Sequence, residues 1–199
     1  MTSTERKQQL LEIAYNMFLS KGYDNTSIDD IIHEAKIAKG TYYYYFESKE
    51  VTLEEVINMM IGEEVKEAKK FLDIPISIPE KLVGIISSLR PKSDEIEIQN
   101  ALNKKENLMM HKIVNDRIIE EAVPLLEQVV NEGIEKQIFN CTHVKERLRI
   151  LLIMSNEMFD DSNVNENEVE VFIDTVEKML GAKQGTLGFI RKLIGGKNE

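Results

Sequence analysis

Apolar residues recur at three- and four-residue spacing through most of the chain, a pattern that predicts amphipathic helices. The first such stretch, Glu5–Lys21, ends at Gly22, which is typical of a helix C-terminus. A second, short helix is expected to begin at Thr26, whose hydroxyl can accept from the backbone N–H of Asp29. A tight turn near Lys36 then leads into a third helix. The first 47 residues therefore predict a helix-turn-helix.

The remainder of the chain also follows helical periodicity. Ser48 is the expected N-cap of a long helix that continues to about Leu72, where a proline-containing segment interrupts it. Further helices are expected over residues 79–89, 94–104, 106–136, 144–160 and 168–180. No segment predicts a strand convincingly, so the expected fold class is all-α. For the short basic amphipathic piece Leu187–Ile194, we favour packing on the protein itself or mobility over contact with a membrane or a partner.

The stretch Ile37–Lys49 contains four consecutive tyrosines, Tyr42 to Tyr45, with lysines on either side. Because an α-helix turns by about 100° per residue, adjacent side chains point in different directions. At most two of these rings can face a core, and the others must present their hydroxyls outward. Hydroxyl and ammonium groups on a short helix are suited to phosphate oxygens and base edges. We interpret this stretch as a DNA recognition helix; the alternative is a surface helix with an aromatic face.

Charge alone does not suggest DNA binding, because the 199-residue chain carries a net charge of −10. Residues 1–50 contain six basic and eight acidic side chains, a net charge of −2. Within Lys36–Lys49, however, three lysines accompany the single acid Glu47, which gives a local charge of +2. A small positive face on an acidic protein is compatible with a nucleic-acid partner.

The composition argues against several other functional classes. No apolar run approaches the roughly 18 residues of a membrane span. No signal-like segment is present either, so we expect a cytoplasmic location and no membrane partner. Cys141 is the only cysteine, and together with His143 it offers too few ligands for a zinc site. No Ser-His-Asp, paired-carboxylate or glycine-rich phosphate motif stands out. We therefore expect no enzymatic activity, no catalytic site, no cofactor and no metal.

The order of these features resembles the N-terminal domain of the TetR/AcrR family of transcriptional regulators. The matching residues fall in register across three helices: Phe18, Gly22-Tyr23, Thr26-Ser27, Ile31, Lys39-Gly40-Thr41, Tyr43, Phe46 and Ser48-Lys49-Glu50. The resemblance implies an all-α protein with a three-helix DNA-binding domain at residues 1–47 and a helical effector-binding and dimerisation domain at residues 48–199. It also implies a homodimer formed through Val144–Asp160 and Glu168–Leu180.

Carried over by position, the resemblance implies different roles for the residues of the recognition helix. Base-edge contacts are expected from three positions: Lys39, Gly40 and Tyr44. Phosphate contacts are expected from five positions: Thr26, Thr41, Tyr43, Tyr45 and Lys49. Tyr42 and Phe46 are expected to pack inward. Three positions depart from the family pattern. Lys36 replaces a turn glycine and Ala38 replaces a frequent serine cap, each at a cost of about 1 kcal/mol. Ile32 is bulkier than the small residue usual at its position, so we expect the two short helices to sit slightly further apart.

The resemblance further implies an effector pocket in the helical body. Methionine adapts to irregular ligands but also fills ordinary cores, so both interpretations stay open for six residues: Met59, Met60, Met109, Met110, Met154 and Met158. The expected function is a ligand-responsive regulator, a repressor that binds a near-palindromic double-stranded DNA operator and is released by a small apolar or aromatic effector. The alternative is a helical interaction protein of the same fold without specific DNA binding.

Overall fold

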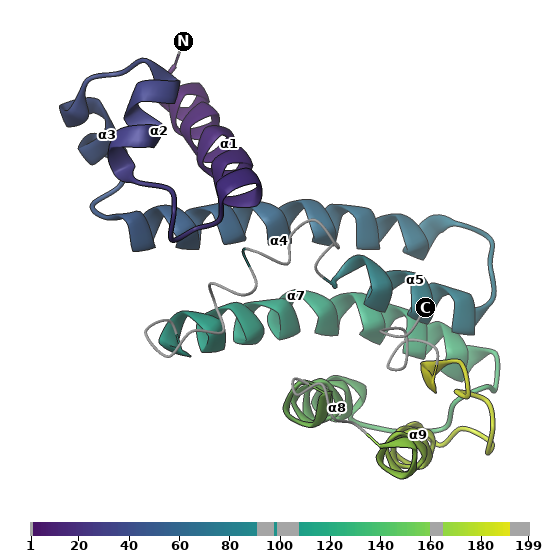
Figure 1. The fold of residues 1–199 in the computed structure, drawn as a ribbon. Coiled ribbons are helices and arrows are strands. Elements are labelled where there is room, and N and C mark those ends of the chain that lie inside the picture. The colour runs from purple at the N-terminus through teal and green to yellow at the C-terminus, as the bar shows by residue number, and fades with distance from the viewer. Residues whose placement is uncertain (1, 91–97, 99–107, 160–164, 192–199) are drawn as a thin grey trace. The chain divides into compact units, whose positions relative to one another are not determined.

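A computed structural model describes residues 2–90, 98, 108–159 and 165–191 (Figure 1). All the regular elements of these residues are helices, so the predicted all-α fold is confirmed. The predicted helix over residues 94–104 lies outside the described residues, apart from Ile98. None of the described helices is long and apolar enough to cross a membrane.

The chain groups into two compact units. The first comprises residues up to Glu63 with the segment 91–114, and the second comprises residues 64–90 and 115–199. The division falls inside the long helix α4 (Lys49–Asp73), whereas the predicted boundary at residues 47 and 48 coincides with the start of that helix.

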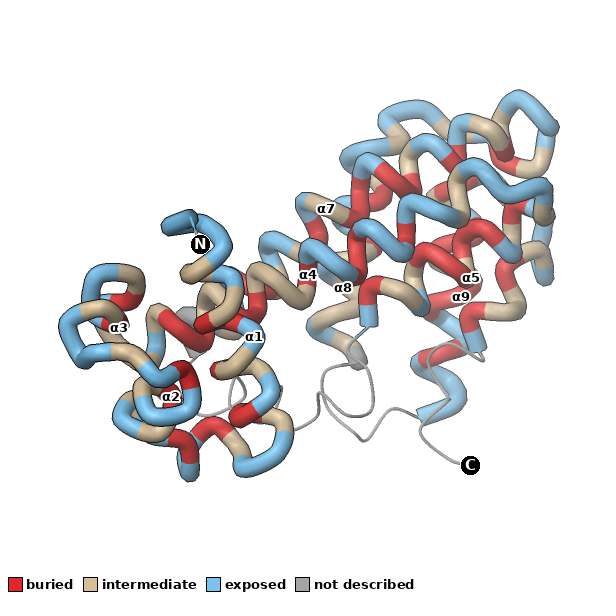
Figure 2. The backbone as a smooth tube through the Cα atoms, turned by 90° about the horizontal axis from the view of Figure 1, so that it is seen from above, coloured by how far each residue is buried: buried red, intermediate tan, exposed pale blue. Residues whose placement is uncertain are grey.

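The first unit is built on α1 (Ser3–Lys21), α2 (Ile28–Ala35), α3 (Lys39–Tyr45) and the first part of α4. Gly22 ends α1 at a φ of 83°, and its amide donates to the Phe18 carbonyl, as the sequence predicted. The core side chains come from all four helices and include Leu10, Phe18, Ile31, Tyr42, Phe46 and Leu53. Figure 2 colours the buried stretches of these helices red. A helix as short as α3 has little stability alone, so its two buried aromatic side chains hold it in place.

The prediction that Thr26 caps α2 is wrong. The N-cap is Ser27, whose hydroxyl accepts from the Asp30 amide at 3.0 Å while the Asp30 carboxylate accepts from the Ser27 amide at 2.8 Å. Thr26 is buried instead, and its hydroxyl donates to the Gly22 carbonyl at 2.9 Å. Thr26 and Ser27 both carry a hydroxyl that could cap the helix. The Thr26 hydroxyl is already bound to the end of α1, so the adjacent Ser27 acts as the cap.

The second unit contains the end of α4, α5 (Ile78–Ser88), most of α7 (Leu108–Glu135), α8 (Val144–Phe159) and α9 (Glu166–Leu180). Ser77 and Asn165 begin α5 and α9 with capping boxes. After α9, Gly181 takes a left-handed conformation with a φ of 63° and the chain turns back. Leu187 and Ile190 are buried, so the described part of the basic amphipathic piece packs on its own protein.

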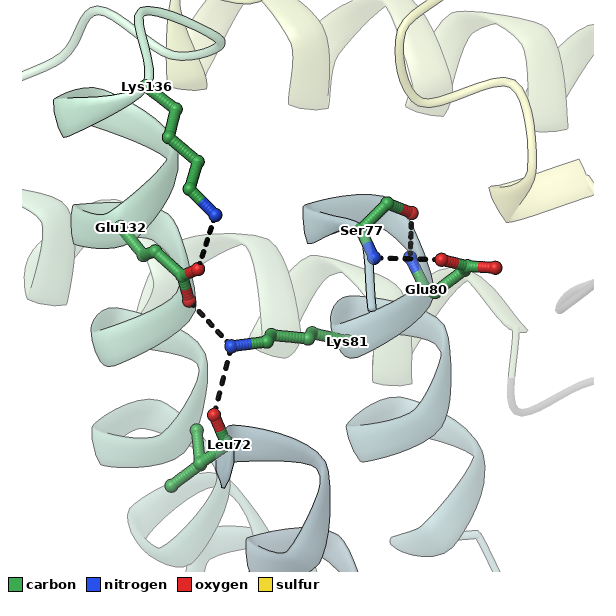
Figure 3. A network of polar contacts seen from close by, with 6 residues as sticks. All are labelled: Leu72, Ser77, Glu80, Lys81, Glu132 and Lys136. Atoms are coloured by element: carbon green, nitrogen blue, oxygen red, sulfur yellow. Dashed lines mark hydrogen bonds and ion pairs between the residues drawn. The ribbon is translucent and has the colours of Figure 1, made fainter. Parts of the chain in front are cut away.

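A buried lysine joins three helices of the second unit (Figure 3). The ammonium group of Lys81 in α5 donates to the Leu72 carbonyl near the end of α4 at 2.9 Å. It also donates to the Glu132 carboxylate in α7 at 2.8 Å. Lys136 binds the other oxygen of that carboxylate at 2.6 Å. Burying the Lys81 charge is tolerable because both of its partners accept hydrogen bonds.

Candidate DNA-binding interface and internal cavity

The entry into α3 has the two weak points that the sequence indicated. Lys36 adopts a left-handed conformation with φ 52° and ψ 49°, which costs a lysine more than a glycine. Ala38 is the N-cap of α3 and provides no side-chain hydrogen bond to the exposed amides of the first turn. Within that turn, the Thr41 amide donates to the Ala38 backbone carbonyl at 2.9 Å.

The four tyrosines have four different surroundings. Tyr42 is fully buried, and its hydroxyl forms a hydrogen bond with that of Thr52 in α4. Burial raises the pKa of Tyr42 although this hydrogen bond opposes the shift. Tyr43 is 44% exposed and Tyr44 is 75% exposed. The hydroxyl of Tyr45 lies 3.3 Å from that of Ser3 at the start of α1. The expectation that the tyrosines cannot share one role agrees with this geometry.

Gly40 lies on the exposed side of α3, and a Cβ built on it would meet no protein atom within 4 Å. Nothing inside the described part of the unit therefore requires a glycine, although glycine weakens a helix by about 0.5–1 kcal/mol relative to alanine. Lys39 beside it is exposed and pairs with Asp29 at 3.4 Å. Such an exposed pair is weak and can exchange partners. Thr41 is half-buried on the same short helix.

Lys49 begins α4 and lies against the turn that follows α1. Its ammonium group is 4.1 Å from the centre of the Tyr23 ring and donates to the Asp24 carbonyl at 3.5 Å. Partial burial lowers the pKa of Lys49, and burial together with the nearby Glu50 carboxylate raises the pKa of Tyr23 to about 12. Thr26 is the expected DNA contact whose side chain is least accessible, because it is 1% exposed.

Comparison with known proteins identifies this arrangement of helices. Residues 10–56 match the family model described as bacterial regulatory proteins, tetR family. This match places the N-terminal part of the chain, residues 10–56, in the tetR family of bacterial regulatory proteins.

Two curated relatives are similar to part of this chain. The uncharacterized HTH-type transcriptional regulator YuxN of Bacillus subtilis is 43% identical over 54 residues, which are 27% of this chain and 19% of that protein. The HTH-type transcriptional repressor KstR2 of Mycolicibacterium smegmatis is 35% identical over 80 residues, which are 40% of this chain and 39% of that protein. The chain thus covers well under two thirds of the length of both relatives.

A solved structure extends the likeness of fold to the whole chain. It is described as a TetR-family transcriptional regulator from Syntrophomonas wolfei and is 21% identical, with a TM-score of 0.59. The match covers 98% of this chain and 98% of the other. The predicted architecture, a helix-turn-helix at the N-terminus followed by a helical C-terminal part, is confirmed.

The second unit contains a partly open apolar cavity of about 100 Å³. Side chains from α5, α7, α8, α9 and the segment after α9 line it, among them Leu82, Leu126, Leu151, Phe172 and Leu187. Arg90 and Ser155 are its polar lining residues. Leucine, isoleucine, valine and phenylalanine make up the rest, a surface that suits an apolar guest.

Of the six methionines predicted for an effector pocket, the four whose side chains are described are not among the lining residues of this cavity. Met59 and Met60 belong to the first unit, where Met59 accepts a hydrogen bond from Gln8 at 3.3 Å. Met154 and Met158 lie half-buried on α8 in the second unit. The side chains of Met109 and Met110 lie outside the described residues. Sequence reasoning missed the cavity because its branched aliphatic lining has the same local pattern as any helical core.

Proposed function

We propose that this protein is a transcriptional regulator, acting as a repressor, that binds a near-palindromic DNA operator as a homodimer through α3. A small apolar or aromatic effector that binds in the second unit releases it from DNA. The match of the N-terminal part to the tetR family supports regulation rather than catalysis, and the relative KstR2 is a named repressor.

The exposed face of α3 is the observation that carries this proposal. Tyr44 exposes three quarters of its surface, and the backbone at Gly40 is open to any partner that approaches closely. Tyr44 contacts the Tyr45 ring at a centroid distance of 4.9 Å but is outside the core, and no packing contact requires a glycine at position 40. A helix that exposes such residues fits the major groove. Tyr43 and Thr41 on the same helix have hydroxyls for phosphate oxygens.

Replacing Gly40 with alanine separates a role in DNA binding from a role in folding. The added methyl group meets no protein atom, so Gly40→Ala should raise stability by about 0.5–1 kcal/mol. It should nevertheless weaken DNA binding, because it adds bulk where the backbone meets the base edges. Gly62→Ala is the matched control: Gly62 lies in α4, and its added Cβ also meets nothing within 4 Å. This control should gain stability and keep its DNA affinity.

Selection of bound sequences from a random DNA pool provides the operator for that test. Failure to enrich any sequence would favour the alternative, a helical interaction protein without specific DNA binding. Unchanged affinity in Gly40→Ala would remove this face of α3 from the interface.

Contacts to phosphates and contacts to bases can be distinguished by how DNA affinity depends on salt concentration and on DNA sequence. Tyr43→Phe combined with Lys49→Ala should lower the dependence of log affinity on log salt by about 0.9 for each phosphate that the protein no longer neutralises. Changes at Tyr44 should alter the preferred sequence more than the overall affinity. An equal reduction of affinity at every sequence would contradict a base-reading role for Tyr44.

The proposed dimer interface, Val144–Asp160 with Glu168–Leu180, is supported by apolar side chains that the single chain leaves exposed. Ile150 and Ile153 in α8 are about half exposed, and Val171 in α9 is 63% exposed. Their spacing places the two isoleucines on one side of α8. Sedimentation should show a dimer at micromolar concentration, and Ile153→Lys should shift it towards monomer. A monomeric wild-type protein would refute this assignment.

A further inference from the structure

The chain after α9 forms part of the wall of the apolar cavity. Residues 182–191, here called the C-terminal segment, fold back against the second unit after Gly181. Leu187 is 1% exposed and Ile190 is 9% exposed, and both line the cavity together with Phe189. Most of the remaining wall comes from α5, α7, α8 and α9, with Arg90 just after the end of α5. The C-terminal segment lies outside these four helices and can move without unpacking one of them.

Phe189 also borders a second, larger space on the outer side. That space is a hollow of about 580 Å³ beside α5, where Phe71, Pro79 and Val83 contribute apolar surface. The Phe71 ring packs directly on Gly84, where an added Cβ would lie 2.1 Å from it. Phe189 is half-buried and is the residue shared by the described linings of the hollow and the cavity. Its side chain therefore stands between them.

A buried carboxylate in α9 fastens the C-terminal segment. Glu177 is 4% exposed, and its two oxygens accept from the Leu187 amide at 2.8 Å and the Gly185 amide at 3.0 Å. Gly185 has a φ of 86°, a conformation that brings its amide to the carboxylate without steric cost. At the end of the segment, Arg191 pairs with Glu170 through two hydrogen bonds, but both side chains are more than half exposed. The main polar attachment is thus a single carboxylate.

We propose that the C-terminal segment controls access to the cavity, with Phe189 as the barrier and Glu177 as the attachment that keeps the barrier closed. An apolar molecule enters from the hollow beside α5 when the segment moves aside, and the cavity then joins the hollow. This inference rests on the proposed effector role of the cavity. A side chain that only filled a core would be enclosed on all sides, whereas Phe189 is half-buried and borders both the cavity and the hollow.

Binding of N-phenyl-1-naphthylamine, an uncharged apolar dye that fluoresces in apolar surroundings, tests the proposal on the full chain. Stopped-flow mixing measures the rate of dye uptake in the wild type, in Phe189→Ala and in Glu177→Gln. The first variant removes the barrier. The second keeps the size of the side chain but leaves one of the two amides without its acceptor. Both should take up dye faster, by about tenfold for Glu177→Gln, the equivalent of one hydrogen bond to a charged group.

Asp174→Asn is the matched control on the same helix. The Asp174 carboxylate pairs with the exposed ammonium group of Lys178, one turn further along α9, at 2.6 Å. The rate of dye uptake by Asp174→Asn should equal that of the wild type. Amide hydrogen exchange supplies a readout that does not depend on dye. Glu177→Gln should lose protection at Gly185 and Leu187, while the Ala182 amide, which donates to the Glu177 backbone carbonyl at 2.9 Å, keeps its protection.

The outcomes separate this proposal from the proposed effector role. Ser155→Leu adds apolar volume to the cavity lining and should prevent dye binding if the cavity is the site. Dye uptake that is blocked by Ser155→Leu, but equally fast in wild type, Phe189→Ala and Glu177→Gln, would overturn the access role and leave the cavity as a site. Dye binding only in Phe189→Ala would support the barrier. No binding in any variant would overturn both.

Discussion

Replacing Glu132 with alanine should destabilise the protein more than replacing either lysine that binds it. The Lys81 side chain is only 9% exposed, and its charge is compensated by Glu132 and the Leu72 carbonyl. Without the Glu132 carboxylate, the nearly buried ammonium group of Lys81 keeps the neutral Leu72 carbonyl as its acceptor. An unpaired buried charge is costly because it is deprived of both water and its counter-ion.

The magnitude follows from the exposure of each group. Removal of one partner from a fully buried ion pair costs about 3–5 kcal/mol. The Glu132 side chain is 30% exposed, so water can partly reach the site, and we expect about 2–3 kcal/mol for Glu132→Ala. Lys81→Met removes the charge and leaves the Leu72 carbonyl without that donor, at a cost of about 1 kcal/mol. Lys136 is 54% exposed, and Lys136→Ala should cost less than about 1 kcal/mol.

Urea unfolding at one fixed protein concentration measures these differences, since any association would otherwise contribute. The melting temperature should fall by roughly 4–12 °C in Glu132→Ala, given about 2–4 °C per kcal/mol for a chain of this size. The order Glu132→Ala, then Lys81→Met, then Lys136→Ala tests the reasoning. If Lys81→Met costs as much as Glu132→Ala, charge compensation is not the reason for the effect.

Four further substitutions have results that can be expected from local geometry and charge. Lys36→Gly should raise the free energy of unfolding by about 1 kcal/mol because Lys36 has a φ of 52°. Gln137 has a φ of 59°, so Gln137→Gly should give a similar gain. Thermal unfolding measures both. Ala38→Ser should add about 1 kcal/mol by supplying the missing cap of α3, measured by urea unfolding; no gain would mean that the cap cannot form. Hydrogen bonds from Lys136 and Lys81 lower the pKa of Glu132 from its usual 4.5. The Glu132 carboxylate therefore contributes its full stabilisation above pH 4.5, and this is lost as the pH falls through the lower pKa of the folded state. In Glu132→Gln, the free energy of unfolding should decrease less steeply with falling pH than in the wild type.

The helices could be predicted from the sequence because each depends on a local pattern. The apolar periodicity of α1 and α8 and the caps at Gly22 and Ser48 need no knowledge of distant residues. The choice between Thr26 and Ser27 as the cap of α2 could not be made locally. It depends on the Gly22 carbonyl, which the turn brings over Thr26.

The cavity and its attachments could not be predicted, because they combine residues from distant elements. Glu177 follows Val176 on the buried side of α9, where a carboxylate is expected only if donors meet it. Those donors are amides of a turn eight and ten residues later. Lys81 likewise occupies a buried position of α5, and its partner Glu132 lies 51 residues away. The apolar periodicity of a helix shows that such charged residues occupy buried positions, but it does not predict which distant groups bind them.

Lys39 and Lys49, the two lysines expected to contact DNA, already interact with other groups of the protein. These interactions affect the affinity of the proposed complex. Lys39 pairs with Asp29, and Lys49 lies over the Tyr23 ring, so each must give up or share an interaction on binding DNA. Each such exchange reduces the net gain from a phosphate contact. The side chains of Tyr43 and Tyr44, in contrast, expose much of their surface to a partner. On an acidic protein, recognition should therefore depend more on hydroxyl hydrogen bonds and less on released counter-ions, with a correspondingly shallow salt dependence.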